Sequence, residues 1–306
     1  MLPSCRGGSV HSYHAIVFDK DGDILADLSV AFVPNEYVSN TKTHSISNKG
    51  KWPGELVVLF RPYCNNYYHW LFDTLPRLES EVCHGESKLY VHQYRAFHRE
   101  TLRILGIKPC KLVSAEKDPF LQSDLMLISS LPCPPLPAPP SVWRLPVVST
   151  DACRFLRQVL APRAVIAVSV PGEASGHLKL FIRRQGARAI ANEEEVWRLL
   201  EFLGFICVAL EEFSLAEQII LFSQAEVVVG VHEAGLSNIL FCKPGTRVVE
   251  LMPSAWAMPC YWSISRHVGL DYKRVNVSSQ ALPGRDASAS SSVHVNLEEL
   301  LAALVE

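Results

Sequence analysis

Hydrophobic and polar positions alternate most regularly in the C-terminal half of the chain. Short apolar runs predict strands at 179–183, 205–210, 226–231 and 247–251. Apolar residues spaced three and four apart predict helices at 192–203, 214–223 and 236–241. Strands and helices that alternate in this order are typical of a parallel α/β sheet.

Polar residues mark where two of these helices begin and end. Asn192 with Glu195, and Ser214 with Glu217, have the spacing of a capping box. Gly204 follows the last apolar position of the first helix and is expected to end it. These signals strengthen the prediction of helices between the strands.

The N-terminal half is less regular but has a similar pattern. Its predicted strands and helices are strands 14–18, 55–60, 88–92 and 124–129 with helices 68–79 and 94–105. At the other end of the chain, Asn296 is expected to cap a final helix that continues to about residue 305, and the polar segment 278–292 is expected to be mobile.

A proline-rich segment, 131–146, interrupts the chain between these halves. Prolines fix φ and remove backbone donors, so this segment fits neither a helix nor a central strand. We therefore expect one α/β domain over 1–140 and a second α/β domain over 147–306. Ligands of two-domain α/β proteins usually bind in the cleft between the domains.

Composition restricts the class of protein further. The 306 residues are 48% hydrophobic and 20% charged, which is typical of a globular protein. With 29 basic and 31 acidic residues the net charge is -2, so no global basic field favours nucleic acid. The nine cysteines show no zinc spacing, the first ten residues lack a signal-peptide pattern, and no apolar run is long enough to span a membrane. We expect a cytoplasmic protein with free, buried thiols, and peripheral association with an inner membrane is the alternative.

The first candidate for ligand binding is the loop 232–238, HEAGLSN, which follows a predicted strand and opens a helix. Free N–H groups at the start of a helix attract phosphate, and ligands of parallel sheets bind at the carboxyl ends of strands. Gly235 permits close approach of a ligand, and Ser237 and Asn238 add hydrogen bonds. The alternative is an ordinary strand-to-helix turn.

Charged residues elsewhere in the C-terminal half form the second set of candidates. Arg183 and Arg184 end a predicted strand and Arg188 follows, so their guanidinium groups suit a diphosphate. A solvated basic turn is the alternative. Glu250 lies among apolar residues on a predicted buried strand and needs a partner, either a ribose or a structural arginine.

The third candidate is the segment 65–77, NNYYHWLFDTLPR. His69 and Asp73 are four residues apart, so on a helix they share one face. Together they could form an oriented base that deprotonates an acceptor hydroxyl. A helix-face pair without a catalytic role is the alternative.

Two further patterns have simpler interpretations. The segment 15–26, AIVFDKDGDILA, is similar to the first motif of haloacid dehalogenase-type phosphatases, but Asp23 stands where that family has Thr or Val. A hairpin turn with Gly22 at positive φ explains it better than a nucleophile at Asp19. His92 and His98 have no acidic partner in helical register and are interpreted as surface or packing residues.

Taken together, five ordered motifs resemble glycosyltransferase family 61. They are NYYHWLFDTLPR at 66–77, FIRRQGARAIANE at 181–193, SLAEQIILFSQA at 214–225, GVHEAGLSNILF at 230–241 and PGTRVVELMP at 244–253. The resemblance implies a GT-B fold, in which two Rossmann-like domains face each other across a cleft. It also implies an inverting transfer that needs no metal or cofactor.

The same resemblance implies roles for individual residues. A nucleotide-sugar, expected to be UDP-linked, would be bound by the C-terminal domain through Arg183, Arg184, Arg188, His232, Gly235, Leu236, Ser237, Asn238 and Glu250. His69 and Asp73 would supply the base. A glycan or lipid-linked acceptor would bind the N-terminal domain, 1–140, and contact Asn66, Tyr68, Trp70 and Arg77. The compact chain without an evident anchor favours a bacterial polysaccharide-biosynthesis enzyme.

One position departs from the family pattern. The family usually has Gly directly after the loop histidine, whereas this chain has Glu233. That carboxylate could repel a diphosphate, require an unusual backbone angle, point away, or pair with an arginine. A non-catalytic relative that binds a nucleotide or glycan is therefore the second hypothesis, and a phosphatase is the third.

Overall fold

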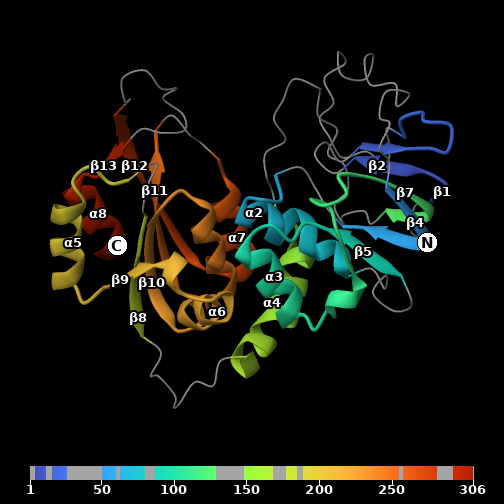
Figure 1. Cartoon of the computed structure of the whole chain (residues 1–306). Coiled ribbons are helices and arrows are strands. Elements are labelled where there is room, and N and C mark those ends of the chain that lie inside the picture. The colour runs from blue at the N-terminus through green and yellow to red at the C-terminus, as the bar shows by residue number, and fades with distance from the viewer. Residues whose placement is uncertain are drawn as a thin grey trace. The chain divides into compact units, whose positions relative to one another are not determined.

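The chain forms two compact units in the computed structural model, Met1–Pro134 and Pro135–Glu306. The structure describes residues 4–11, 16–25, 50–59, 63–79, 87–128, 148–167, 177–184, 189–254, 258–280 and 292–305. The division falls within the proline-rich segment, which lies outside the described residues. Both units are mixed α/β, with one sheet each (Figure 1).

The N-terminal unit contains a mixed sheet in the order β3-β2-β7-β4-β5-β6, with β1 also paired to β7. Strands β4, β5, β6 and β7 are parallel, whereas β1 and β2 run antiparallel to β7. The strands are β1 Ser4–Arg6, β2 Ser9–His11, β3 Ile16–Phe18, β4 Gly50–Val58, β5 Lys88–Val91, β6 Leu112–Ser114 and β7 Phe120–Ile128.

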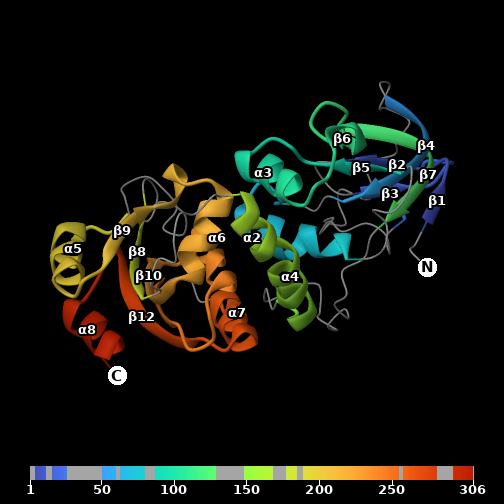
Figure 2. The same ribbon diagram turned by 90° about the horizontal axis from the view of Figure 1, so that it is seen from below.

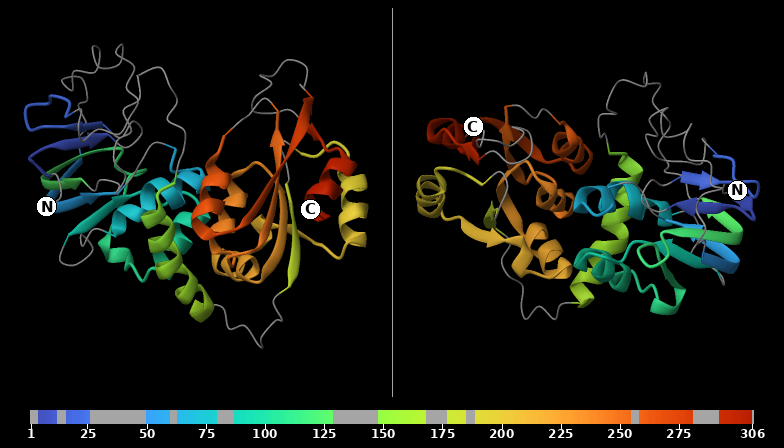
Figure 3. Two further views of the ribbon diagram at one scale, coloured as in Figure 1. Left: turned by 180° about the vertical axis from the view of Figure 1, so that it is seen from behind. Right: turned by 45° about the horizontal axis from the view of Figure 1, so that its top comes forward.

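The helices of this unit lie to one side of its sheet (Figures 2 and 3). The regular helices are α2 Tyr67–His69 and α3 Ala96–Ile104, with a short 3-10 turn at Pro109–Lys111. The helix expected at 68–79 exists but changes its hydrogen bonding along its length. A π-helical segment, Trp70–Thr74, follows α2, and a 3-10 segment, Leu75–Leu78, ends it. Pro76 lacks an N–H and so cannot continue an α-helical ladder.

The C-terminal unit contains a sheet in the order β13-β12-β11-β10-β8-β9. All neighbours from β9 to β12 are parallel, as the alternating pattern predicted, and β13 is antiparallel. The strands are β8 Leu178–Arg183, β9 Ile206–Ala209, β10 Ala225–Val231, β11 Arg247–Pro253, β12 Asp271–Gln280 and β13 Ser292–His294.

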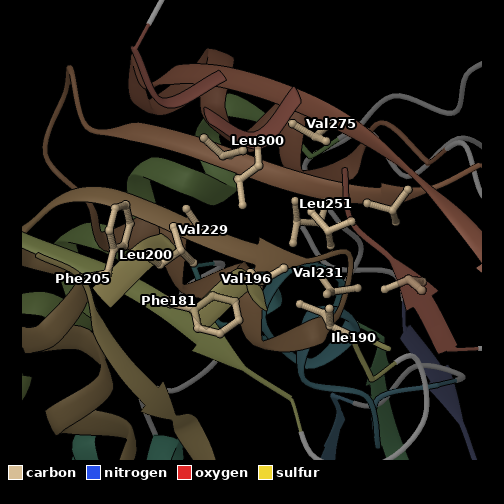
Figure 4. Close-up of a cluster of buried hydrophobic side chains, with 14 residues drawn as sticks. Phe181, Ile190, Val196, Leu200, Phe205, Val229, Val231, Leu251, Val275 and Leu300 are labelled. Carbon is tan, nitrogen blue, oxygen red and sulfur yellow. The ribbon is translucent and has the colours of Figure 1, made fainter. Parts of the chain in front are cut away.

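Helices cover both faces of this sheet (Figures 1 and 2). On one face α5 and α8 bury Val196, Leu200 and Leu300 against the strand residues Phe181 and Val229 (Figure 4). Burial of such side chains contributes about 1.5–3 kcal/mol each. On the other face α6 contacts α4. Both α6 and α7 also pack against the 3-10 helix Ala234–Phe241. The helices are α4 Thr150–Ala167, α5 Glu193–Phe202, α6 Leu215–Ser223, α7 Cys260–Val268 and α8 Leu297–Val305, with 3-10 helices Leu210–Glu212 and Ala234–Phe241.

Two predicted helix caps have different outcomes. The Ser214–Glu217 capping box is confirmed, with the Ser214 N–H donating to Glu217 at 2.8 Å. The Asn192–Glu195 capping box is wrong, since the Asn192 side chain makes no cap hydrogen bond. Its amide instead bonds both the N–H and the C=O of Val295, each at 3.0 Å. This distant partner outcompetes the local cap because the Asn192 amide satisfies two backbone groups of Val295 at once.

Two helices and two strands of the C-terminal unit, α4, α7, β12 and β13, escaped prediction. Helix α4 contains Pro162, and α7 and β12 carry mixed polar and apolar residues. The segment expected to be mobile, 278–292, begins inside β12, where Ser278 pairs with His294. Its residues 281–291 lie outside the described part of the chain.

The hairpin interpretation of 15–26 is confirmed for its described part. Phe18 and Ile24 form an antiparallel bridge, and Gly22 has φ of +90°. The Asp19 carboxylate accepts hydrogen bonds from the N–H groups of Asp21 and Asp23, each at 2.9 Å. The bond from Asp23 is the main reason why the Asp19 pKa is lowered. Asp19 therefore stabilises a turn, as the hairpin interpretation expects.

Candidate functional site

Three neighbouring parallel strands bring polar side chains to one edge of the C-terminal sheet. Strands β8, β10 and β11 are adjacent, so their carboxyl ends meet at the same edge. Arg184 follows β8, His232 follows β10, and Glu250 lies within β11. The His232 N–H extends the ladder to the Leu251 carbonyl at 3.0 Å. The sheet itself therefore sets the position of this group.

Glu250 satisfies both of its carboxylate oxygens inside the protein. Its side chain is fully buried, Oε1 hydrogen-bonds His232 Nδ1, and Oε2 accepts from the Tyr272 hydroxyl at 2.5 Å. Burial first, and then the charge of Glu250, raise the pKa of Tyr272, so its hydroxyl stays protonated and donates. Within the described residues, the partners of this carboxylate are His232 and Tyr272 rather than the expected structural arginine. Glu250 instead fixes the orientation of the His232 ring.

Tyr272 is a site residue that the sequence did not reveal. It lies on β12, where Val248 of β11 is its register partner and Glu250 pairs with Arg274. Tyr272 is thus the diagonal neighbour of Glu250 on the same face of the sheet. The sequence did indicate that buried Glu250 needs a partner. It could not identify Tyr272, because β12, the strand that carries it, was not predicted.

Glu233 pairs with an arginine, which was one of the four possibilities for this position. Arg184 Nη1 lies 2.8 Å from Glu233 Oε2, and both side chains are largely buried. Glu233 has φ of -159°, an extended backbone that any residue adopts. Its carbonyl accepts a hydrogen bond from the Tyr261 hydroxyl. The structure thus replaces the glycine of the family pattern without backbone strain and joins the loop to β8 and α7.

The two adjacent arginines have different surroundings. Arg183 is about half exposed and bonds Glu193 of α5 at 2.9 Å, whereas Arg184 reaches the 232–238 loop. The structure therefore places Arg184, and not Arg183, beside the candidate site. Arg188 lies outside the described residues.

The remaining residues of the 232–238 loop are packed inside the unit. Leu236, Ser237 and Asn238 are buried, and Asn238 donates to Gln218 of α6 at 2.9 Å. A Cβ at Gly235 would lie 2.8 Å from Leu210 Cδ1, so a larger residue there would require the Leu210 side chain to shift. The Ser237 hydroxyl is fully buried and makes no hydrogen bond in the described structure. Among the side chains of this loop, Ser237 alone has a buried polar atom without a hydrogen-bond partner in the described structure.

The N-terminal unit contains a second histidine–carboxylate pair. His69 Nδ1 lies 2.7 Å from Asp73 Oδ2, and each side chain is about one third exposed. Their backbone belongs to α2 and the π-helical segment, a rare conformation that is frequent at functional sites. A bond from Nδ1–H to the carboxylate leaves Nε2 as the basic atom of the ring. This geometry suits a general base.

The residues expected to contact an acceptor differ in their exposure. Asn66 is exposed and accepts from the Tyr68 N–H at 2.9 Å. Tyr68 is buried, and Arg77 is 4% exposed with Nε bonded to the Asp73 carbonyl. Trp70 is completely buried and donates to Thr101. The structure does not support Trp70 as an acceptor contact, because the helix turns its ring into the core.

His92 and His98 are buried, which confirms the interpretation as packing residues and excludes the alternative of surface residues. His92 Nδ1 lies 2.9 Å from Glu116 Oε1. Burial opposes a charge on His92, but hydrogen bonds with Cys64 and Glu116 outweigh it and raise its pKa to about 9. Burial is also the main reason why the pKa of His98 is lowered to about 4. The partner of His92 lies on another segment, which helical spacing could not reveal.

Thiols and metal ligands add little to this description. The seven cysteines of the described residues are free, and Cys110 and Cys207 are exposed, contrary to the expectation of buried thiols. Within the same residues, no group of three or more His, Cys, Asp or Glu side chains is arranged to hold a metal ion. No helix in the described ranges is long and apolar enough to cross a membrane.

Comparison with known proteins identifies a family. The profile described as Glycosyltransferase 61 matches residues 67–249, which is more than half of the chain. A xylan glycosyltransferase from Arabidopsis thaliana is 33% identical over 101 residues, 31% of this chain and 20% of that protein. A β-1,2-xylosyltransferase from Oryza sativa subsp. japonica is 26% identical over 242 residues, 75% of this chain and 41% of that protein.

Two further similarities are more limited. A protein O-linked-mannose β-1,4-N-acetylglucosaminyltransferase 2 from Tetraodon nigroviridis is 32% identical over 112 residues, 36% of this chain and 19% of that protein. The chain thus spans between 19% and 41% of the length of these relatives. The crystal structure of TibC, a bacterial iron-containing dodecameric glycosyltransferase from enterotoxigenic E. coli, has a TM-score of 0.32 and 15% identity, over 80% of this chain and 70% of that one. Similarity at this level does not establish a shared fold. The sequence relatives named here do not support the expectation of a bacterial source.

Proposed function

Since the chain belongs to glycosyltransferase family 61, we propose that it transfers a sugar from a nucleoside diphosphate to a hydroxyl of a glycan or lipid-linked acceptor. UDP is the proposed nucleotide, and the proposed reaction inverts the anomeric carbon without a metal. The proposed arrangement is GT-B. The relatives named xylosyltransferase and N-acetylglucosaminyltransferase suggest xylose and N-acetylglucosamine as the first sugars to test.

The observation that carries this proposal is the convergence of Arg184, His232 and Glu250 at one edge of the C-terminal sheet. That edge, beyond the carboxyl ends of parallel strands, is where nucleotides bind in α/β proteins. We assign donor binding to it. Arg184 would contact the diphosphate, and His232, held by Glu250, would donate or accept a hydrogen bond in a fixed direction.

We assign proton removal to His69 in the N-terminal unit. As the acceptor oxygen forms its bond to the anomeric carbon, its proton moves to Nε2 of His69. The bond from that carbon to the diphosphate breaks, and its electron pair leaves with the diphosphate. Asp73, 2.7 Å from Nδ1, would stabilise the imidazolium that results. A positioned base of this kind contributes about 100- to 10,000-fold in rate.

Thermal unfolding with nucleotides tests the donor assignment. UDP, GDP, UDP-xylose and UDP-N-acetylglucosamine would each be added with magnesium and with a chelator. A ligand at about 100 times its dissociation constant adds about 2.7 kcal/mol of stability, which raises Tm by a few degrees. A shift with UDP compounds that survives chelation supports the proposal. Absence of any shift contradicts donor binding.

The Arg184–Glu233 ion pair favours a second candidate function. It already neutralises the guanidinium that a diphosphate would use, and it places a carboxylate in the same loop. A non-catalytic relative that binds a glycan is the corresponding hypothesis. Under it, Glu233→Gly gains nucleotide binding that the parent protein lacks. Strong UDP binding by the parent protein would exclude this hypothesis.

A further inference from the structure

Tyr63 has an unusual backbone conformation for its residue type. Among the described residues, it is the one non-glycine residue with positive φ, at 65°. Bulky side chains rarely adopt this left-handed region, because Cβ crowds the backbone there. Strain of this kind persists where the surrounding structure enforces it, and it clusters at functional sites. A glycine would fit this position without strain, so the aromatic side chain itself requires an explanation.

Packing does not explain the tyrosine. Its side chain is 73% exposed, so it adds little to the core of the unit. The backbone around it has a clear role, since the Tyr63 carbonyl accepts from the Asn66 N–H at 2.8 Å and closes the turn that leads into α2. The turn needs the conformation, but it does not need the ring.

The ring lies beside the proposed base. The centroids of the Tyr63 and His69 rings are 5.8 Å apart, with 41° between their planes. His69 in turn bonds Asp73, and both side chains are about one third exposed. Asn65 and Asn66, in the same turn, are also exposed. An aromatic face, amide groups and a histidine–carboxylate pair therefore share one short segment of surface.

This combination matches the chemistry of a sugar. One face of a pyranose ring presents C–H groups, which pack against an aromatic face, while its hydroxyls require hydrogen-bond donors and acceptors at the edge. An exposed tyrosine supplies the apolar face at little cost in side-chain entropy. Amides and a carboxylate supply the polar partners.

We propose that Tyr63 is the stacking platform of a saccharide subsite, and that it holds an acceptor sugar beside His69. Sugar binding is inferred from the surface chemistry of the turn alone. The identification of that sugar as the acceptor depends on the proposed function. The subsite extends the candidate site to a residue outside the motif segment 66–77, and it gives the Tyr63 ring, which the turn does not need, a task in ligand positioning.

Three substitutions separate the ring, its hydroxyl and the backbone strain. Tyr63→Phe keeps the aromatic face, Tyr63→Ala removes the ring, and Tyr63→Gly removes the ring and relieves the positive φ. Tyr94→Ala is the matched control, since Tyr94 is a 64% exposed tyrosine of the same unit with Arg95 over its ring. Binding to immobilised xylo-, manno- and N-acetylglucosamine oligosaccharides, thermal stability and the Tm shift with UDP would be measured for each full-length protein.

We expect the parent protein to bind one of these oligosaccharide classes. Tyr63→Ala and Tyr63→Gly should weaken that binding about 10-fold, while Tyr63→Phe and Tyr94→Ala retain it. Tyr63→Gly should leave Tm unchanged or higher, because it relieves strain and removes little packing. Loss of sugar binding without loss of stability separates a ligand contact from a structural role.

Two results would overturn the inference. One is equal sugar binding by the parent protein, Tyr63→Ala and Tyr63→Gly, and the other is no binding of any of the oligosaccharides. If the UDP shift is present in either case, the donor assignment stands and the Tyr63 subsite alone fails. If the UDP shift is absent while sugar binding depends on Tyr63, the subsite stands and the transferase proposal fails.

Discussion

The two units each contain a histidine whose Nδ1 is bonded to a carboxylate, but the two pairs differ in burial. The side chains of His69 and Asp73 in the N-terminal unit are 33% and 34% exposed. Those of His232 and Glu250 in the C-terminal unit are 7% and 0% exposed. The Tyr272 hydroxyl donates to the second carboxylate oxygen of Glu250. The same chemical groups are thus accessible in one unit and enclosed in the other.

This difference indicates different tasks. A base must receive a proton from a substrate and release it to water, so partial exposure suits His69. A buried, fully bonded carboxylate holds its partner in one orientation and resists exchange, so Glu250 suits a positioning role for His232. If the comparison is correct, substitutions in the first pair affect turnover, and substitutions in the second affect stability.

The largest effect is expected on turnover in the N-terminal pair. His69→Ala and Asp73→Asn should lower the rate of sugar transfer about 100- to 10,000-fold, because the proposed base or its partner is lost. The Tm shift with UDP should stay unchanged. Asp21→Asn, at an exposed carboxylate of the same unit, is the control. Normal turnover in both variants would show that the base lies elsewhere.

The next largest effect is expected on stability in the C-terminal pair. Glu250→Ala should lower the free energy of unfolding by about 3–5 kcal/mol, since it removes the partner of two buried groups. Asp73→Asn should lower it by less than about 1 kcal/mol, because solvent screens that pair. Denaturant unfolding measures both values. Equal losses would show that burial does not distinguish the two pairs.

A smaller effect separates the adjacent arginines. Arg184→Ala should weaken UDP binding about 10- to 100-fold, because it removes a charge-assisted contact at the candidate site. Arg183→Ala should change it little, since Arg183 bonds Glu193. The double variant Arg184→Ala with Glu233→Ala controls for the carboxylate left without its partner. Calorimetric titration with UDP measures each affinity, and a larger loss in Arg183→Ala would reverse the assignment.

The smallest effect concerns a third histidine–carboxylate pair, His92 and Glu116. The pKa of His92 is raised to about 9, so its stabilising contribution is complete below its unfolded value near 6.5 and is lost as pH rises through 9. Burial opposes the charged form of Glu116, but hydrogen bonds from His92, Ser114 and Gln93 outweigh it and lower the pKa to about 2. The stabilising contribution of Glu116 is therefore lost as pH falls from about 4.5 through 2.

Buried His98 adds a second slope on the acid side. Its pKa of about 4 means that its contribution is present above about 6.5 and is lost as pH falls through 4. Together these groups predict that Tm is highest near pH 6.5. His92→Gln should remove the decline between pH 6.5 and 9, by a few degrees. An unchanged alkaline decline in that variant would assign it to other groups.

Local patterns accounted for most of the C-terminal fold. The strands β8 to β11, the Ser214 cap and the stop at Gly204 follow from apolar spacing and single-residue backbone preferences, which act over a few residues. Prediction was poorer where contacts between distant segments decide. Asn192 bonds Val295 rather than its own helix, and α4 continues through Pro162 although proline disfavours a helix interior.

The candidate site divides in the same way. The sequence by itself determined that His69 and Asp73 are paired and that His232 follows a strand of a parallel sheet, because each depends on spacing along one segment. Only the tertiary structure decided that Tyr272 bonds Glu250, that Arg184 rather than Arg183 meets Glu233, and that Trp70 is buried. Those outcomes depend on strand register and on which face of a helix meets the core, and both are set by packing between segments far apart in the chain.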